Sequence, residues 1–165
     1  MLAGTAVGAV AVGLGLPRNL LGSAPPDPAW RAVAGQVRVV DGETLRLGER
    51  VVRLHGLRAP ARGENCAAPG GDRFDCGAAA AERLAGLVLD RAVECRLRGR
   101  DSFHRALGVC VAGETELNAA LVAAGYALAD GEGTPDLAQR ETEARSGRQG
   151  LWAASGPPSD WQSRR

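Results

Sequence analysis

The 165-residue sequence contains no lysine, so all 20 of its basic side chains are arginines, and 19 acidic residues nearly balance them. The net charge of +1 argues against a strongly basic polyanion-binding protein and equally against an acidic buffer protein. Aromatic residues make up only 4% of the chain, which leaves few side chains on which nucleic-acid bases would stack. Composition therefore singles out no function, and function has to be argued from particular residues.

Closely spaced C-x-x-C pairs, which are typical of zinc sites, are also absent. Cys66 and Cys76 would instead close a short loop. Cys95 and Cys110 lie in two strand-like segments, and a hairpin turning at residues 102–103 would place them opposite one another. We therefore expect disulfides Cys66–Cys76 and Cys95–Cys110, each stabilising the fold by roughly 3 kcal/mol, in an oxidising compartment. Four cysteines allow three connectivities, and buried free thiols are the alternative.

The one long uncharged run covers residues 1–16. It has the length of the apolar part of a signal peptide and is short for a membrane-spanning helix. Gly22-Ser23-Ala24 is a small-x-small cleavage candidate. We expect a signal peptide or short membrane anchor at residues 1–24, a linker at 25–33 and a C-terminal tail at 153–165. The protein is thus expected to be exported, to the periplasm or the medium, or tethered to a membrane by its N-terminal segment.

The remaining residues, 34–152, read as one domain. Alternating patterns and turn residues predict strands at 34–40, 44–47, 50–57, 92–98 and 105–112. Helical patterns follow at 76–90, from a cap at Thr115 to Gly125, and at 136–146, while 58–76 is expected to be a loop. This order predicts an α+β protein with a mainly β core, a five-stranded Greek-key OB-fold barrel with about three appended helices.

An ordered set of short motifs then points to a family. Asp41-Gly42-Glu43-Thr44, Val52-Arg53-Leu54 and Ala59-Pro60 resemble the DGDT, VRL and D-A-P-E motifs of the thermonuclease (staphylococcal nuclease-like) family. The resemblance runs in order over about residues 34–161, and its later matches are Cys66, Cys76-Gly77, Asp101–Arg105, Leu117-Asn118 and Gly150-Leu151-Trp152. The cysteines and residues 158–161 resemble the exported, cysteine-containing bacterial branch. The resemblance implies an OB-fold nuclease that hydrolyses DNA and RNA phosphodiesters with one calcium ion.

The phosphate-holding arginines of the family are matched by Arg53 and Arg105. Such arginines hold a phosphate by paired hydrogen bonds and offset the charge that develops on its oxygens. The turn before Arg105 departs from the family's D-x-Y-G-R pattern, because Phe103 replaces the tyrosine and His104 replaces the glycine. The resemblance thus carries a phosphate clamp over to this chain.

The metal and base positions of the family are largely lost. The first metal-ligand aspartate is Glu43, one methylene longer, with Asp41 and Thr44 nearby as residual candidates. The second is Arg58, and the glutamate that serves as general base is Ala61. Calcium requires oxygen ligands, chiefly carboxylates, and an arginine at about 4 Å would repel it by several kcal/mol. We therefore expect neither calcium nor another metal here.

The hypothesis that follows is a catalytically degenerate nuclease homologue. We expect a metal-free pocket for phosphate or a nucleic-acid backbone, formed by Arg53, Arg58, Arg105 and His104. An ion pair of Arg58 with Glu43 or Asp41, filling the site, is the alternative. We expect a monomer with no specific protein partner.

A second hypothesis is an active nuclease with altered chemistry, in which Glu43 takes a new role. Glu64, three residues beyond Ala61, or one of the two histidines, His55 and His104, would then replace the missing base. A third is a purely structural module of the cell envelope.

Overall fold

The computed structural model describes residues 28–153. Three expected segments lie outside the described residues: the signal peptide or anchor, the first residues of the linker, and the C-terminal tail after residue 153. Within 28–153, no helix is both long and apolar enough to cross a membrane.

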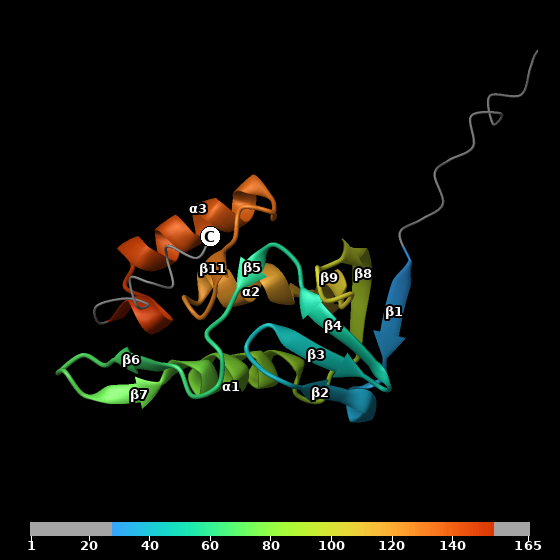
Figure 1. Ribbon diagram of the computed structural model, residues 1–165, viewed down its shortest axis with the longest axis horizontal. Helices are drawn as coiled ribbons and strands as arrows, with labels where there is room; N and C mark the ends of the chain where they lie inside the picture. The colour runs from blue at the N-terminus through green and yellow to red at the C-terminus, as the bar shows by residue number, and fades with distance from the viewer. Residues whose placement is uncertain (1–27, 154–165) are drawn as a thin grey trace, which may run out of the picture.

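A mixed sheet forms the centre of the molecule (Figure 1). Its strands follow the order β1-β8-β9-β4-β3-β2. A short β10 pairs with Val111 and Ala112 at the end of β9. All neighbours are antiparallel except β4 and β9, which are parallel. The strands are β1 (Ala29–Ala32), β2 (Val37–Val39), β3 (Thr44–Leu47), β4 (Arg50–Leu54), β8 (Val93–Arg100), β9 (Ala106–Ala112) and β10 (Thr115–Glu116).

Two small pairs of strands lie off this sheet. A hairpin of β6 (Asn65–Ala67) and β7 (Arg73–Asp75) extends beyond the start of the first helix, and β5 (Leu57–Arg58) pairs with β11 (Leu128–Ala129) (Figure 1). Strand β5 follows β4 in the chain, and its partner β11 precedes the third helix, which contacts β11 and the second helix.

Three α-helices occur in the described part of the chain: α1 (Cys76–Val88), α2 (Leu117–Ala123) and α3 (Pro135–Ser146). The side chain of Asp75 caps α1 by accepting a hydrogen bond from the Ala78 N–H. In α3, proline stands in the first turn with Asp136, and Arg145 stands in the last turn, in accord with the helix dipole. Short 3₁₀ turns, η2 (Ala34–Gln36) and η3 (Gly150–Ala153), precede β2 and follow α3.

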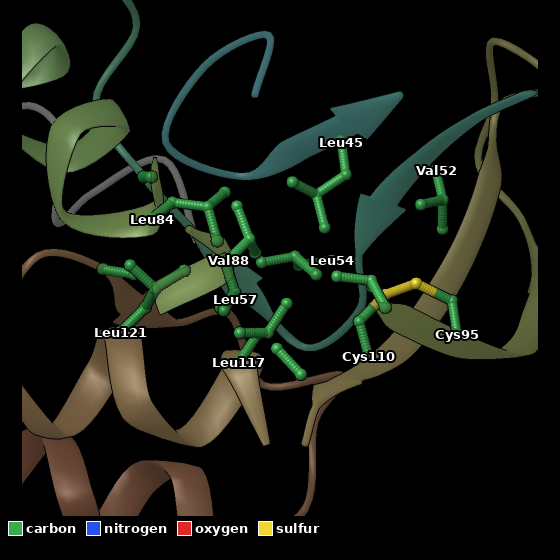
Figure 2. Close-up of a cluster of buried hydrophobic side chains, with 14 of the residues drawn as sticks. Leu45, Val52, Leu54, Leu57, Leu84, Val88, Cys95, Cys110, Leu117 and Leu121 are labelled. Atoms are coloured by element: carbon green, nitrogen blue, oxygen red, sulfur yellow. A yellow bond between two sulfur atoms is a disulfide. The ribbon is translucent and has the colours of Figure 1, made fainter. Parts of the chain in front are cut away.

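The hydrophobic core lies between the sheet and the helices (Figure 2). Leu45 of β3 and Leu54 of β4 are fully buried against Leu84 of α1 and Leu117 of α2. Because side chains alternate along a strand, β3 and β4 direct every second residue inward. At the end of the described part of the chain, Leu151 and Trp152 are buried as well.

Both expected disulfides are confirmed, Cys66–Cys76 and Cys95–Cys110. The second joins directly opposed residues of β8 and β9 and lies in the core (Figure 2). The first joins the hairpin β6–β7 to the first residue of α1. Two buried disulfides indicate an oxidising compartment.

The α+β class, the mainly β core and the three helices are confirmed, and the arrangement is consistent with an OB-like fold. The hydrogen-bonded strands described here nevertheless form an open path from β1 to β2 rather than a closed barrel. The third strand ends at Leu54, earlier than expected, because Gly56 adopts a φ of 79° and turns the chain into β5.

Four boundaries differ from expectation. Residues 29–32, expected in the linker, form the edge strand β1 against β8, and residues 34–36 form η2 instead of the start of a strand. The segment 58–76, expected to be a loop, contains β5 and the hairpin β6–β7. Thr115 lies in β10 rather than capping α2, whose N-cap is Glu116. Strands β1 and β5 exist through pairing with β8 and β11, which are distant in sequence, and local patterns do not reveal such pairing. The hairpins β6–β7 and β9–β10 join neighbouring segments, in which β6, β7 and β10 are only two or three residues long.

Candidate functional site

A pocket of about 360 Å³ opens beside β3 and β4, between the segment after β5 and the turn that joins β8 to β9. Its lining consists of Glu43, Arg53, Arg58, Ala59, Ala61, Glu64, Asp101, Ser102, Phe103 and Arg105. We call it the arginine pocket. The structure thus brings together the family-matched arginines and the positions of the lost carboxylates, which are up to 62 residues apart in the chain.

Glu43 and Arg53 form an ion pair at the back of the pocket. Arg53 Nε donates to Glu43 Oε1 over 2.7 Å, and the side chains are only 14% and 17% exposed. The register of β3 and β4 sets this pair, because Thr44 lies opposite Arg53. The second carboxylate oxygen, Oε2, accepts the backbone N–H of Ala59 over 2.8 Å. Both oxygens of Glu43 are therefore engaged by the protein itself.

The environment of Arg53 keeps it charged. Burial alone would lower its pKa, but the hydrogen bond and the negative charge of Glu43, with smaller contributions from Asp130 and Asp101, raise the pKa above its ordinary value. Arg53 uses Nε for Glu43 and makes one long contact, 3.5 Å, from Nη2 to the Leu57 carbonyl. A guanidinium has five N–H donors, so Arg53 keeps donors for a ligand.

Asp101 organises the turn that carries Arg105. Its Oδ1 accepts the backbone N–H groups of Phe103 and Arg105, and its Oδ2 accepts Arg105 Nε over 2.7 Å. Desolvation would raise the pKa of Asp101, but these hydrogen bonds and the charge of Arg105 together lower it below its ordinary value. The Arg105 guanidinium also lies 5.4 Å from the centre of the Phe103 ring. Phe103 itself is 78% exposed at the rim of the pocket.

His104 adopts a φ of 62° in this turn. That left-handed conformation is the one glycine adopts without strain, which explains why the family pattern has glycine here. His104 is exposed, and it is not among the residues that line the arginine pocket. His104 is thus not one of the residues that the structure brings together in the arginine pocket.

Strand β5 supplies Arg58, and the segment after it supplies Ala61 and Glu64, to the same pocket. Glu64 Oε2 accepts the Ala61 N–H over 2.8 Å, so this carboxylate reaches back to the position where the family has its base. The segment packs tightly on the start of α1, where a Cβ on Gly77 would collide with the carbonyl of Ala61. The Cys76 N–H donates to the Glu64 carbonyl, next to the disulfide.

The oxygen donors of this pocket do not fit calcium, which takes six to eight oxygen ligands. Glu43 is occupied by Arg53 and Ala59, Asp101 is occupied by Arg105 and its own turn, and Arg58 stands among them. Asp41 caps the N–H of Glu43, and the buried hydroxyl of Thr44 has no hydrogen-bond partner in the described structure. Within residues 28–153, no cluster of three or more His, Cys, Asp or Glu could hold a metal ion.

Comparison with known proteins indicates the same family as the sequence motifs. The family model for staphylococcal nuclease homologues matches residues 51–154. The chain belongs to the staphylococcal nuclease family. A micrococcal nuclease of Shigella flexneri is 35% identical, over 84% of this chain and 84% of its own length.

Two further family relatives are similar over most of the domain. The succinoglycan biosynthesis protein ExoI of Rhizobium meliloti is 30% identical over 76% of this chain and 68% of its own length. The protein ParB of Escherichia coli is 32% identical over 84% of this chain and 82% of its own length. The predicted resemblance to the thermonuclease (staphylococcal nuclease-like) family is thus confirmed.

Sequence reasoning missed one buried residue that shapes the site region. Asn118 is 1% exposed, and its side-chain oxygen accepts the Cys110 N–H. Its Nδ2 donates to the carbonyls of His55, over 2.8 Å, and Gly108. It thereby ties α2 to β9 and to the end of β4. The Leu117-Asn118 motif was a signal for this residue but not for its role. His55 itself lines a different pocket from Arg53, Arg58 and Arg105.

Proposed function

We propose that this family member binds phosphate groups or a nucleic-acid backbone in the arginine pocket without the calcium-dependent hydrolysis that the family resemblance implies. The observation that carries the proposal is the ion pair of Glu43 with Arg53, completed by the Ala59 N–H. The residual ligand position for a metal is thereby used inside the protein. Arg58 and Ala61 line the same pocket, at the positions where the family resemblance implies the other metal ligand and the base.

Binding would rest on the remaining guanidinium donors. Arg53 and Arg105 each commit Nε to a carboxylate, which fixes the plane of the guanidinium and leaves other N–H groups for phosphate oxygens. Glu43 and Asp101 are then positioning residues that orient the two arginines. Arg58 adds a third positive charge to the same pocket.

The affinity expected from this arrangement is modest. Three arginines line the pocket, but so do three carboxylates, Glu43, Glu64 and Asp101. Formal charge in the pocket is therefore balanced, and long-range attraction of a polyanion is weak. We expect dissociation constants of roughly 0.1–1 mM for a mononucleotide at physiological salt, corresponding to about 4–5.5 kcal/mol.

The test is a titration of the full chain with inorganic phosphate and with a fluorescein-labelled single-stranded DNA, in EDTA. Binding should persist in EDTA, weaken at least tenfold in Arg53→Ala and Arg105→Ala, and remain unchanged in Arg83→Ala. Arg83 is the matched control because it is an exposed arginine of α1 outside the pocket. Equal binding by all four proteins would refute the proposal.

A second candidate function is a nuclease of altered chemistry, favoured by one contact. The Glu64 carboxylate accepts the Ala61 N–H, which places a carboxylate next to the lost base position. In this candidate Glu64 would take a proton from the attacking water. The check is DNA hydrolysis by the natural chain in EDTA, with Glu64→Gln beside it. Hydrolysis that disappears in Glu64→Gln would establish this candidate over the first.

We further propose that the protein acts outside the cytoplasm, in the periplasm or the medium or tethered by its N-terminal segment. The support is the pair of buried disulfides, which persist in oxidising compartments. Thiol trapping of the protein in cell fractions tests it. Reduced protein confined to the cytoplasm would contradict it.

A further inference from the structure

A groove of about 470 Å³ lies between β2 and α1 (Figure 1). We call it the β2–α1 groove. One wall consists of β2 and the turn η2 before it, and the other consists of α1 from Ala81 onward with Leu89 and Asp90, while Arg62 lines the groove as well. The groove shares no lining residue with the arginine pocket. Its occupant can therefore be tested apart from phosphate binding.

Exposed apolar side chains gather around this groove. Within residues 28–153, four large apolar side chains are exposed, and three of them are Val33, Val40 and Leu89. Leu89 is 67% exposed and lines the groove itself. Val33 is the N-cap of η2, and the carbonyl of Val40 accepts a hydrogen bond from Arg62. Apolar side chains that are exposed singly need no explanation, but several around one groove indicate an interaction surface.

The outer edge of β2 is covered by two arginines. In the described chain β2 is the last strand of the sheet path. Arg38 Nη1 donates to the carbonyls of Gly35 and Val37 over 2.9 and 2.8 Å. Arg62 Nε donates to the Val40 carbonyl over 2.9 Å. Because an added strand pairs through the backbone groups of an edge, these contacts favour a partner that packs by its side chains over a peptide that extends the sheet.

The two walls of the groove carry opposite charges. Arg38 stands on the β2 wall, beside Val40 and its partner Arg62, and Glu82 and Asp90 stand on the α1 wall. Within residues 28–153, no ion pair joins the two walls. Two arginines and two carboxylates leave the groove without net formal charge, which disfavours a polyanion or an anionic membrane.

A surface with this arrangement of charge is complementary to itself. In a two-fold pair of identical chains, the same patch meets itself, so a basic wall on one copy faces the acidic wall of the other, and the contact occurs twice. Apolar side chains between such walls are then buried at the centre of the contact, with the charges around them.

We propose that the β2–α1 groove is the contact surface between two copies of this chain. The Arg38 wall of each copy faces the Asp90 wall of the other, and Leu89 packs into the groove of the other copy. This inference differs from the monomer that the sequence led us to expect. Because the arginine pocket lies outside the groove, substitutions in the groove should change association but neither phosphate binding nor the unfolding of the single chain.

Sedimentation velocity of the full chain, over a wide range of protein concentration at low salt, measures the association. The natural chain should shift from monomer to dimer as its concentration rises. Leu89→Asp should weaken association roughly tenfold or more, because it places a carboxylate at the centre of the contact. The exposed position of Leu89 leaves the fold intact. Phe103→Asp is the matched control, an exposed apolar residue outside the groove, and should associate like the natural chain.

A charge exchange tests the two-fold arrangement. Glu82→Arg with Asp90→Arg makes both walls basic, and Arg38→Glu with Arg62→Glu makes both walls acidic. Each double variant alone should associate roughly tenfold more weakly, and an equal mixture of the two should recover association to within about threefold of the natural chain. Urea unfolding checks that each variant is folded. If the acidic variant does not fold, Leu89→Asp and the basic variant decide the question.

Three results would overturn the inference. The first is a natural chain that stays monomeric at every concentration. The second is association that persists equally in Leu89→Asp and in the charge variants, because it would then run through another surface, such as the apolar segment 1–16. The third is a mixture of two folded charge variants that fails to associate. Phosphate binding, measured on the same proteins, stands or falls separately.

Discussion

Replacing Glu43 by glutamine should weaken the fold and strengthen phosphate binding at the same time. Glu43→Gln removes one negative charge from the arginine pocket but keeps an oxygen that can accept the Ala59 N–H. Arg53 then loses its charged partner at 2.7 Å while its side chain is still only 14% exposed. The two effects have opposite signs because the carboxylate stabilises the arginine and repels the ligand.

The sizes follow from the geometry. Breaking a buried ion pair on one side costs 3–5 kcal/mol, and glutamine retains part of the hydrogen bonding, so unfolding free energy should fall by about 2 kcal/mol. A charge about 6 Å from a bound phosphate, at an effective dielectric near 40, is worth roughly 1.4 kcal/mol. Phosphate affinity should therefore rise roughly tenfold.

Urea unfolding measures the first effect, and calorimetric titration with inorganic phosphate measures the second, with Glu82→Gln as the matched control on the exposed face of α1. The control should change neither quantity. Weaker phosphate binding in a folded Glu43→Gln protein would refute the reasoning, because it would show that orientation of Arg53 matters more than charge. An unchanged stability would show that the ion pair contributes nothing.

Other predictions test residues that stabilise the fold around the arginine pocket. Asn118→Ala should lower the unfolding free energy by roughly 2–4 kcal/mol in urea, since it leaves buried backbone groups unpaired; a loss below 1 kcal/mol would contradict its role. Replacing Cys95 and Cys110 together by alanine should cost about 3 kcal/mol, and an equal melting temperature would oppose this. Gly77→Ala should destabilise the protein by thermal melting, because its Cβ meets a loop carbonyl. The pKa of Asp75 is lowered, first because its carboxylate accepts the Ala78 N–H. This interaction contributes stability that is present above the ordinary aspartate pKa near 3.8 and is lost as the pH falls through the lowered pKa. The loss of unfolding free energy in Asp75→Ala should therefore shrink in acid, and a loss that stays constant with pH would refute this.

Local patterns in the sequence predict the parts of the fold that form from neighbouring residues. The strand at 44–47 alternates and is bounded by turns, so its limits are found as expected. The helix at 76–90 begins at the expected residue, after the Asp75 cap, and ends two residues early. The strand β1 and the pair β5–β11 could not be predicted in this way, because each is short and exists only through its distant partner.

The candidate site shows the same division. The family resemblance predicts Arg53, Arg58 and Arg105 in one pocket, and all three line the arginine pocket. An ion pair of Arg58 with Glu43 or Asp41 was one of two alternatives, and the partner that the structure shows for Glu43 is Arg53, which the register of β3 and β4 brings beside that carboxylate. The balance of charge in the pocket was not foreseen, because Asp101 was seen only as part of a motif. Its contact with Arg105 depends on the geometry of the turn.

The surroundings of His55 and Asn118 could not be predicted from the sequence. A histidine on a strand shows no sign of which nitrogen is buried or unpaired. An asparagine beside a helix start shows no sign of the strand that it will satisfy. Both features arise from the packing of α2 and α3 on the end of β4.

The most direct test of the central claim restores the family residues. The natural chain and a Glu43→Asp, Arg58→Asp, Ala61→Glu variant are assayed for hydrolysis of single-stranded DNA with calcium and with EDTA. The account predicts that the natural chain is inactive in both conditions and that the variant cuts DNA only with calcium. Calcium-dependent cutting by the natural chain, abolished by Arg105→Ala, would contradict the account.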